Sequence, residues 1–303
     1  MNRRVEWTIA PDQAGRRLDL ALAAHLTELS RSMVQELIKN GAVTVDGKPG
    51  KPSQKLRGGE RVSCLLPEPP PPPTLQATAM DLPILFEDEH LIAIDKPAGL
   101  VVHPGAGRET ASVVAAVLAH CPLSPIGAPL RPGVVHRLDK ATSGVLLLAK
   151  TQAAHQRLAR QFAARTTEKE YLAIIQGHPR EAAARIEVAI ERDRLHRQRM
   201  KATPAGHGRM AISSYQVLER LKGAALVRVR IETGRTHQIR VHMAYIGHPL
   251  LGDVTYGGRR FAGKAVHFLH ARRLALTHPM TGAPLVLEAP LPPAFEQALA
   301  TLR

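Results

Sequence analysis

Residues 67–73 of this 303-residue chain are six prolines and one glutamate, and neither a helix nor a central sheet strand can accommodate such a segment. Proline lacks a backbone N–H group and restricts φ, so a proline run adopts an extended polyproline helix with a rise of about 3.1 Å per residue. We therefore expect a semi-rigid spacer about 20 Å long. It should separate a small domain of residues 1–66 from a large domain of residues 81–303, with residues 67–80 as the linker.

The small domain has the pattern of two short helices and a small sheet. Helical periodicity covers residues 17–25, and Ser32 has capping-box spacing at the start of a second helix that ends at residue 40. Alternating apolar residues predict strands over residues 43–45 and 60–65. A core of this size is marginal, which suits an accessory module.

Strand signals dominate the large domain. They cover residues 91–94, 100–102, 145–148, 171–175, 186–190, 212–218, 225–231 and 284–287. Helical periodicity is clearest over residues 112–119, 153–165, 236–246 and 295–302. Because the strands come in runs with few intervening helices, we predict an α+β fold built on a mixed, largely antiparallel sheet, preceded by a small N-terminal α/β domain.

The charge of the chain favours a polyanionic partner. There are 41 lysines and arginines against 26 aspartates and glutamates, a formal net charge of +15. RNA or DNA would fit this excess, although a halo of solubilising arginines would give the same number. One tryptophan, four tyrosines and five phenylalanines leave little material for stacking several single-stranded bases. We therefore expect binding that is mostly electrostatic and shape-driven.

Cysteine content and hydropathy indicate the compartment. Two cysteines, Cys64 and Cys121, cannot form a disulfide framework or a four-thiolate zinc site. No apolar run approaches the ~18 residues of a membrane span, and the first residues lack the apolar segment of a signal peptide. We expect a monomeric, cytoplasmic protein with no membrane partner.

Residues 136–144, with the sequence HRLDKATSG, follow a Pro-Gly turn and precede an apolar strand. Arg137 and Lys140 flank Asp139 and favour its ionised form, which a carboxylate nucleophile or general base requires. A salt-bridged loop would contain the same residues. The chemistry of the segment alone therefore allows either a catalytic or a structural role for Asp139.

This segment resembles the signature HRLDxxTSG of the pseudouridine synthases that modify large-ribosomal-subunit RNA, and it matches every fixed position. Four further segments resemble motifs of that family and occur in the same order along the chain: residues 95–105, 169–173, 234–242 and 269–271. The resemblance implies the pseudouridine synthase fold and isomerisation of uridine with no cofactor and no metal.

The resemblance also implies roles for single residues. Its catalytic residues would be Asp139, Tyr171 and Arg240, with Asp139 as the nucleophile. Its substrate-binding residues would be Arg137, Leu269, Thr142 and Lys96. Arg137 would fill the space that a flipped-out uridine vacates, and Leu269 would form an apolar wall.

Elementary chemistry allows these roles and also ordinary ones. On a helix over residues 236–246, Arg240 can pair with Asp139 and hold it ionised, but it could equally be a surface arginine of a basic protein. Tyr171 can pack on a uracil face and touch a polar edge with its hydroxyl group, yet a strand tyrosine is more often part of the core.

The fifteen histidines show no metal-binding pattern. His237 and His242 are five residues apart rather than four, and no glutamate or cysteine pair accompanies them. We expect His136 and His237 to orient loops.

The N-terminal segments 17–19, 30–32 and 39–47 are similar to the signature of S4 RNA-binding modules. That similarity implies RNA contacts through Arg17, Arg31 and Lys39.

Residues 192–201 carry five basic residues against one acidic residue. A solvated loop would have the same composition, but between two strands of an RNA enzyme we expect a loop that grips phosphates. Its contacts would be Arg194, Arg197, Arg199 and Lys201.

The leading hypothesis is an enzyme that isomerises specific uridines in ribosomal RNA of the large subunit or its precursor. Two alternatives remain: a transfer-RNA pseudouridine synthase, and a non-catalytic RNA-binding or ribosome-assembly protein on the same scaffold. An RNA hydrolase that uses histidine is disfavoured, because no motif places a histidine pair or a metal cluster.

Overall fold

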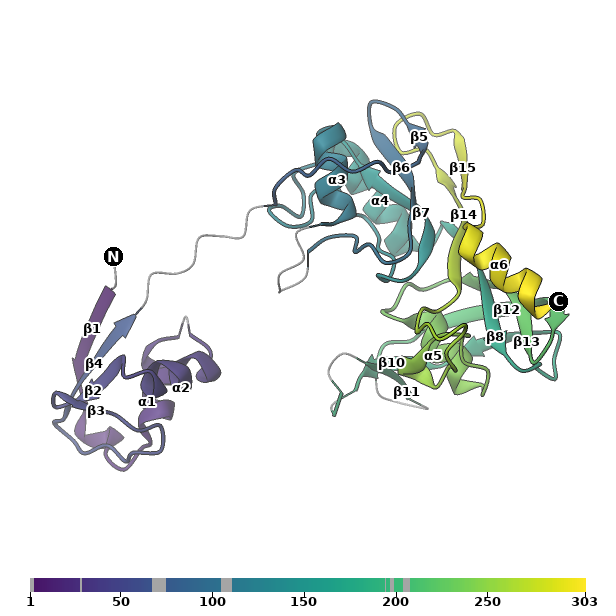
Figure 1. The fold of residues 1–303 in the computed structure, drawn as a ribbon. Coiled ribbons are helices and arrows are strands. Elements are labelled where there is room, and N and C mark those ends of the chain that lie inside the picture. Colours follow the sequence, from purple (N-terminus) through teal and green to yellow (C-terminus); the bar gives the residue numbers. More distant parts are fainter. Residues whose placement is uncertain are drawn as a thin grey trace. The chain divides into compact units, whose positions relative to one another are not determined.

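The computed structural model describes residues 3–27, 29–66, 75–104, 111–193, 195–196, 199–203 and 208–303. The chain forms two compact units, Met1–Pro73 and Thr74–Arg303 (Figure 1). The proline run over 67–73, for which we predicted a semi-rigid spacer, lies outside the described residues. Among the described residues, no helix combines the length and the apolarity needed to cross a bilayer.

The first unit is a four-stranded antiparallel sheet with two helices. The strand order is β1-β4-β2-β3. The element bounds are β1 Arg3–Thr8, α1 Leu18–His25, α2 Arg31–Lys39, β2 Val43–Val45, β3 Lys48–Pro49 and β4 Arg61–Leu66, with a 3₁₀ turn at Pro11–Gln13. The two helices bury Leu18, Leu22, Val34 and Ile38 in a core that the sheet completes.

Helix α2 begins two residues earlier than the capping-box pattern predicted. Ser30 is the N-cap residue, and its hydroxyl group accepts a hydrogen bond from the Met33 N–H at 3.3 Å. The Ser32 hydroxyl lies 2.9 Å from that of Ser30, and the Gln35 amide donates to Asp19 at 2.9 Å. The capping box at Ser32 is therefore wrong: Ser30 already caps this helix, and Gln35 has a tertiary partner.

The second unit is built on one large sheet with the strand order β5-β6-β7-β14-β8-β13-β12-β9, and β15 pairs with β14 (Figure 1). Its strands are β5 Ile84–Glu87, β6 Leu91–Lys96, β7 Ser143–Ala149, β8 Glu168–Gln176, β9 Ala183–Glu187, β12 Ile212–Leu221, β13 Ala224–Ile231, β14 Leu269–Thr277 and β15 Pro284–Glu288. A separate hairpin consists of β10 Ala189–Arg192 and β11 Met200–Thr203. The pairing of β7 with β14 is parallel and the other described pairings are antiparallel. The predicted α+β fold with a mixed, largely antiparallel sheet is confirmed.

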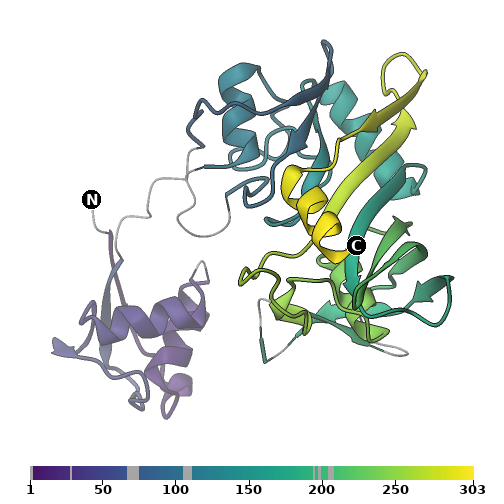
Figure 2. The ribbon, with the colours of Figure 1, turned by 45° about the vertical axis from the view of Figure 1, so that its right-hand side comes forward.

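Helices cover both faces of this sheet. Their bounds are α3 Val113–His120, α4 Gln152–Ala164, α5 Gln238–Tyr245 and α6 Pro293–Leu302. Helices α3 and α5 share one apolar cluster with alternate residues of β6 and β7, whereas α4 packs on the remaining residues of these strands. Alternate residues of a strand point to opposite faces, so α3 and α4 lie on opposite faces of the sheet. Helix α6 packs against β8, β12 and β13 (Figure 2).

Two of the predicted strands differ from the structure. Residues 100–102 form no strand; the carbonyl groups of Val101 and Val102 instead accept hydrogen bonds from the first turn of α3 at 2.9 and 3.0 Å. These residues are apolar because Val102 is buried beside that helix. The strand predicted over residues 186–190 is divided at Val188 between β9 and β10.

Gly144 explains why the HRLDKATSG segment must end in glycine. It lies at the start of β7 opposite Ala271 of β14, with φ at +104°. A Cβ atom on residue 144 would lie 2.3 Å from the Ala271 carbonyl oxygen. Only glycine allows both the positive φ and this approach, so Gly144 lets the loop that carries Asp139 enter the sheet directly beside β14.

Candidate active site

The loop that carries Asp139 is fixed by buried groups on both sides. His136 accepts a hydrogen bond from the Leu147 N–H at 2.9 Å, and its ring stacks on Phe162. Burial lowers the pKa of His136 to about 4, so its ring is neutral and can accept this bond. Leu138 is buried, whereas the side chain of Asp139 is 18% exposed. The loop therefore presents Asp139 at its surface while its neighbours anchor it.

Lys96 supports the same loop from beneath. Its side chain is fully buried, and its ammonium group donates to the carbonyl oxygens of Pro97, Leu100 and Lys140 at 2.8, 2.8 and 3.1 Å. Burial lowers the pKa of Lys96 to about 8, still above neutral pH. Lys96 does not line the pocket described below, so we assign it the support of the loop rather than the substrate contact expected from the sequence.

Replacing Lys96 by methionine should therefore damage the loop. Three carbonyl groups would lose the donor that Lys96 supplies, and we expect a loss of unfolding free energy on the order of 3 kcal/mol. Thermal unfolding measures this loss, with Lys222→Met at an exposed lysine as the control. A Lys96→Met protein as stable and as active as the wild type would contradict the supporting role.

Six of the seven residues that the resemblance singled out line one pocket of about 90 Å³. They are Arg137, Asp139, Thr142, Tyr171, Arg240 and Leu269. Strand β8 contributes Tyr171, strand β14 contributes Leu269, and helix α5 contributes Arg240. Leu138, Ile231 and Ile239 add apolar side chains, and residues 234–238 complete the lining, so the carboxylate of Asp139 shares the pocket with both apolar and polar groups.

Arg240 holds two carboxylates at once. Its Nη1 donates to Asp139 Oδ2 at 3.3 Å, which is one of the two arrangements that the sequence allowed. Its shorter bonds go to Asp253: Nε to Oδ2 at 2.7 Å and Nη2 to Oδ1 at 2.9 Å. Burial alone would lower the pKa of Arg240, but the hydrogen bonds and charge of Asp253, with the charge of Asp139, raise it above its ordinary value. The guanidinium therefore stays charged and fixed in orientation beside Asp139.

Asp253 is the functional residue that sequence reasoning missed. Its side chain is 1% exposed, and it stands in a tight turn directly after Gly252, which has φ at +83°. A Cβ atom on residue 252 would lie 2.0 Å from the Val266 carbonyl oxygen. A Gly-Asp pair in a glycine-rich turn after the apolar residues 249–251 was the available signal.

Tyr256 connects this site to the β10–β11 hairpin. The Arg240 Cζ lies 4.9 Å from the centre of its ring, a cation–π contact. Its hydroxyl oxygen accepts from the Met200 N–H at 2.9 Å and lies 2.7 Å from His237 Nδ1. Burial lowers the pKa of His237, so its ring is neutral. When the hydroxyl group donates to Nδ1, the ring proton sits on Nε2, which lies 3.9 Å from Asp139 Oδ2.

Tyr171 contributes a neutral phenol to the pocket. Burial and then the charge of Asp139 raise its pKa above the ordinary value for tyrosine. Tyrosine with its ordinary pKa of about 10 is already neutral at pH 7, and this shift keeps the Tyr171 phenol neutral at higher pH as well. The ring of Tyr171 can therefore pack on an uncharged base.

Thr142 is held in place by His267, whose Nε2 lies 3.1 Å from the hydroxyl oxygen of Thr142.

The residues expected to contact RNA in the first unit form an ion-pair cluster. Arg17 makes two hydrogen bonds to the buried Asp19, at 2.9 and 3.1 Å, and Arg31 makes one at 3.1 Å. Both arginine side chains stay about half exposed, so they can also meet a phosphate. Lys39 is exposed at the end of α2.

The Asp19 cluster should make the first unit sensitive to acid. Hydrogen bonds from Arg17, opposed by burial, hold the pKa of Asp19 well below its ordinary value. Its contribution is present above the unfolded-state value of about 3.9 and is lost as pH falls through the folded-state value. We expect amide protection in α2 to fall below about pH 4, measured by hydrogen exchange. Asp19→Asn should lower protection at pH 7 and remove this pH dependence; equal protection in the variant would contradict it.

The basic segment over residues 192–201 is only partly described. Arg194 and Arg197 lie outside the described residues. Arg199 lies over the Tyr256 ring, 5.6 Å from its centre, and Lys201 pairs with Glu191 at 3.1 Å. These two residues therefore belong to the hairpin that borders the pocket.

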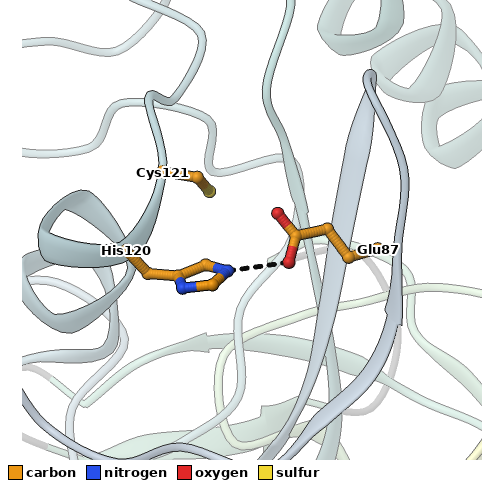
Figure 3. A group of neighbouring side chains, drawn as sticks. All are labelled: Glu87, His120 and Cys121. Atoms are coloured by element: carbon orange, nitrogen blue, oxygen red, sulfur yellow. Dashed lines mark hydrogen bonds and ion pairs between the residues drawn. The ribbon is translucent and has the colours of Figure 1, made fainter.

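One group of potential metal ligands lies away from the pocket among the described residues. Glu87, His120 and Cys121 place their ligating atoms within 4.8 Å of one another (Figure 3). His120 Nε2 lies 2.7 Å from one Glu87 carboxylate oxygen, and Lys150 Nζ lies 2.8 Å from the other. Because both oxygens have partners and an ammonium group opposes a cation, we assign this group to ion pairing between β5, α3 and the end of β7.

Comparisons with known proteins agree with this geometry. Residues 90–245 match the family model described as RNA pseudouridylate synthase, and residues 16–62 match the S4 domain. The chain is 41% identical over 304 residues to the "Uncharacterized RNA pseudouridine synthase YlyB" of Bacillus subtilis, covering 99% of this chain and 98% of the relative. It is 43% identical over 308 residues to the "Ribosomal large subunit pseudouridine synthase D" of Nitrosomonas europaea, covering 99% and 88%.

A solved structure shares the fold. The "Human RNA Pseudouridylate Synthase Domain Containing 4" aligns with a TM-score of 0.58 at 28% identity. The alignment covers 73% of this chain and 93% of the human chain. The sheet described above is therefore that of a known group of RNA-modifying enzymes.

Proposed function

The chain belongs to the RNA pseudouridylate synthase family, and from this premise we propose that it isomerises uridines of large-subunit ribosomal RNA with Asp139 as the nucleophile. One observation carries the proposal. Asp139 lines a pocket that also has apolar side chains, and it lies beside an arginine that a second, buried carboxylate holds in place. This arrangement orients a carboxylate beside a fixed positive charge, where a flipped-out base can meet it.

The reaction exchanges one bond between base and sugar for another. The N1–C1′ bond of the uridine breaks, the base turns, and a C5–C1′ bond forms; C5 loses its hydrogen and N1 gains one. Asp139 can attack ribose C1′, attack C6 of uracil, or assist formation of a glycal. In each route the ionised carboxylate acts first, and no external redox or phosphate donor enters the balance.

The other pocket residues hold the detached base. Tyr171 offers a neutral aromatic face on one side, and Leu269 with Ile231 forms an apolar wall that excludes water. Arg137 is exposed at the mouth of the pocket, where it can enter the space that the uridine leaves in the RNA. These roles let the base rotate without escaping.

Ribosomal RNA is the substrate that the relatives favour. The chain matches several proteins named ribosomal large subunit pseudouridine synthase D at about 40% identity over most of their length. The net charge of +15 and the S4 match add a general affinity for structured RNA. The monomeric state and the cytoplasmic location expected from the sequence remain predictions.

Loss of the C5 hydrogen supplies the test. Unmodified large-subunit ribosomal RNA and transfer RNA, both transcribed with tritium at C5 of uridine, are incubated with the purified protein, and tritium release to water is counted. We expect release from the ribosomal transcript alone. Release only from transfer RNA would support the runner-up substrate, and release from neither, with intact RNA binding, would support the non-catalytic alternative.

Removing residues 1–66 should weaken binding without destroying the chemistry. This segment holds 11 lysines and arginines against 7 aspartates and glutamates, a balance of +4, and none of the pocket residues. A tethered RNA-binding module raises the effective concentration of the catalytic unit at its target, so we expect the loss mainly in affinity and site choice. Binding and turnover at saturating RNA are measured separately. Normal affinity with no turnover would show instead that the module completes the active site.

A further inference from the structure

A second cavity lies directly beside the active-site pocket. It measures about 490 Å³, within the range of small-ligand sites. The two cavities share Arg137, Leu138, Asp139, His237 and Arg240 as a common wall. Two groups that are joined in one RNA strand can therefore occupy them together, one on each side of Asp139.

His103 lines this cavity, and one of its ring nitrogens lacks a partner. The residue is 9% exposed, and its Nδ1 is buried without a hydrogen-bond partner among the described residues. Most buried polar atoms in proteins have a partner, so this one suggests a group that is not present. Burial, with the charges of Arg131 and Arg137, lowers the pKa of His103 to about 4. The ring is neutral at pH 7 and suits a neutral polar partner, such as a base edge or a ribose hydroxyl group.

Positive charge lies on the same cavity. Arg131 lines it and is exposed, and it is near enough to His103 to affect the titration of that ring. A guanidinium group at the surface suits an anionic oxygen, and phosphate is the anion that RNA supplies. The neutral ring of His103 suits the base or ribose of one nucleotide, and the guanidinium group of Arg131 suits its phosphate.

We propose that this second cavity holds the nucleotide adjacent to the target uridine, with its base or ribose hydrogen-bonded to His103 and its phosphate beside Arg131. The inference rests on the proposed function, because the target must lie in the pocket at Asp139. It adds a means of choosing among uridines: a neighbour that cannot reach His103 leaves a buried polar atom unpaired.

A double-mutant cycle between protein and RNA tests the contact. The substrate is a synthetic RNA hairpin that carries a uridine mapped as a target, made unmodified, or with an abasic or a 2′-deoxy residue at either neighbouring position. Pseudouridine formation is measured at limiting RNA with the wild type and with His103→Leu. We expect His103→Leu to lose about five- to tenfold in kcat/KM on unmodified RNA, the value of one hydrogen bond. One altered neighbour should cost the wild type a similar factor and should cost the variant nothing further.

The two kinds of altered RNA separate the possible contacts. Coupling with the abasic residue alone indicates the base, and coupling with the 2′-deoxy residue indicates the ribose. If, at both neighbouring positions, the loss from the altered RNA and the loss from His103→Leu simply multiply, there is no coupling and the inference is overturned, provided that the wild type is active on unmodified RNA. A wild type that is inactive on unmodified RNA would instead overturn the proposed function, and this inference with it.

Two further variants keep the test independent of folding. Arg131→Gln, at an exposed site, should weaken binding and lose its effect when the neighbouring phosphate is replaced by an uncharged methylphosphonate. Arg180→Gln is the matched control, since it is exposed and lines neither cavity. An equal loss in both variants would show that charge in general, rather than this cavity, is responsible.

Discussion

Asp139→Asn is expected to abolish pseudouridine formation and to leave RNA affinity within several-fold of the wild type. Asparagine keeps the size of the side chain and can still accept the hydrogen bond from Arg240, so the pocket should keep its shape. The neutral amide of asparagine is not a nucleophile that can attack carbon. Loss of the nucleophile in other enzymes lowers kcat on the order of 10⁴-fold or more. RNA affinity depends mainly on phosphate contacts spread over a protein of net charge +15.

Single-turnover pseudouridine formation and filter binding measure the two quantities on the same RNA. Asp81→Asn is the control, because Asp81 is exposed and lines neither the pocket nor the adjacent cavity. Turnover of Asp139→Asn near that of the wild type would remove Asp139 from the chemistry. A loss of binding as large as the loss of rate would favour the non-catalytic RNA-binding protein.

Arg240→Met should cost about 10²- to 10³-fold in turnover, and more than Arg240→Lys. Methionine leaves Asp139 and the buried Asp253 without the cation between them. A buried carboxylate that loses its cation takes up a proton more readily, and protonated Asp139 is no nucleophile. Lysine keeps the charge but cannot make the paired bonds to Asp253 and the bond to Asp139 together, so a partial defect is expected.

A double variant separates chemistry from stability in the Arg240 series. Arg240→Met should also unfold at a lower temperature, and adding Asp253→Asn should restore part of that loss by removing the uncompensated buried charge. Wild-type turnover in Arg240→Met at neutral pH would make Arg240 an ordinary structural arginine.

The sequence could predict most residues that meet in the pocket because its motifs are short and contiguous. Asp139 with Arg137 and Thr142 comes from one segment of nine residues, and α5 and β8 each carry one further residue at a motif position. The alternation of apolar residues likewise predicted most strands of the sheet and the α+β class. Residues 100–102 show the limit of that pattern, since burial under α3 and pairing in a sheet give the same apolar run.

Contacts across the chain could not be predicted in this way. Arg240 and Asp139 are 101 residues apart, and the motif offered no reason to place Asp253 on the other side of the same guanidinium. The role of Lys96 depends in part on the carbonyl group of Lys140, 44 residues away, and the tertiary partner of Gln35 is Asp19, 16 residues away. Each of these depends on how segments meet, which no periodicity within a segment records.

Mapping pseudouridine in total RNA from cells with and without this protein tests the central claim most directly. In cells without the protein, we expect pseudouridine to disappear at specific uridines of large-subunit ribosomal RNA, and to return with the wild type but not with Asp139→Asn. An unchanged map, or changes confined to transfer RNA, would contradict it.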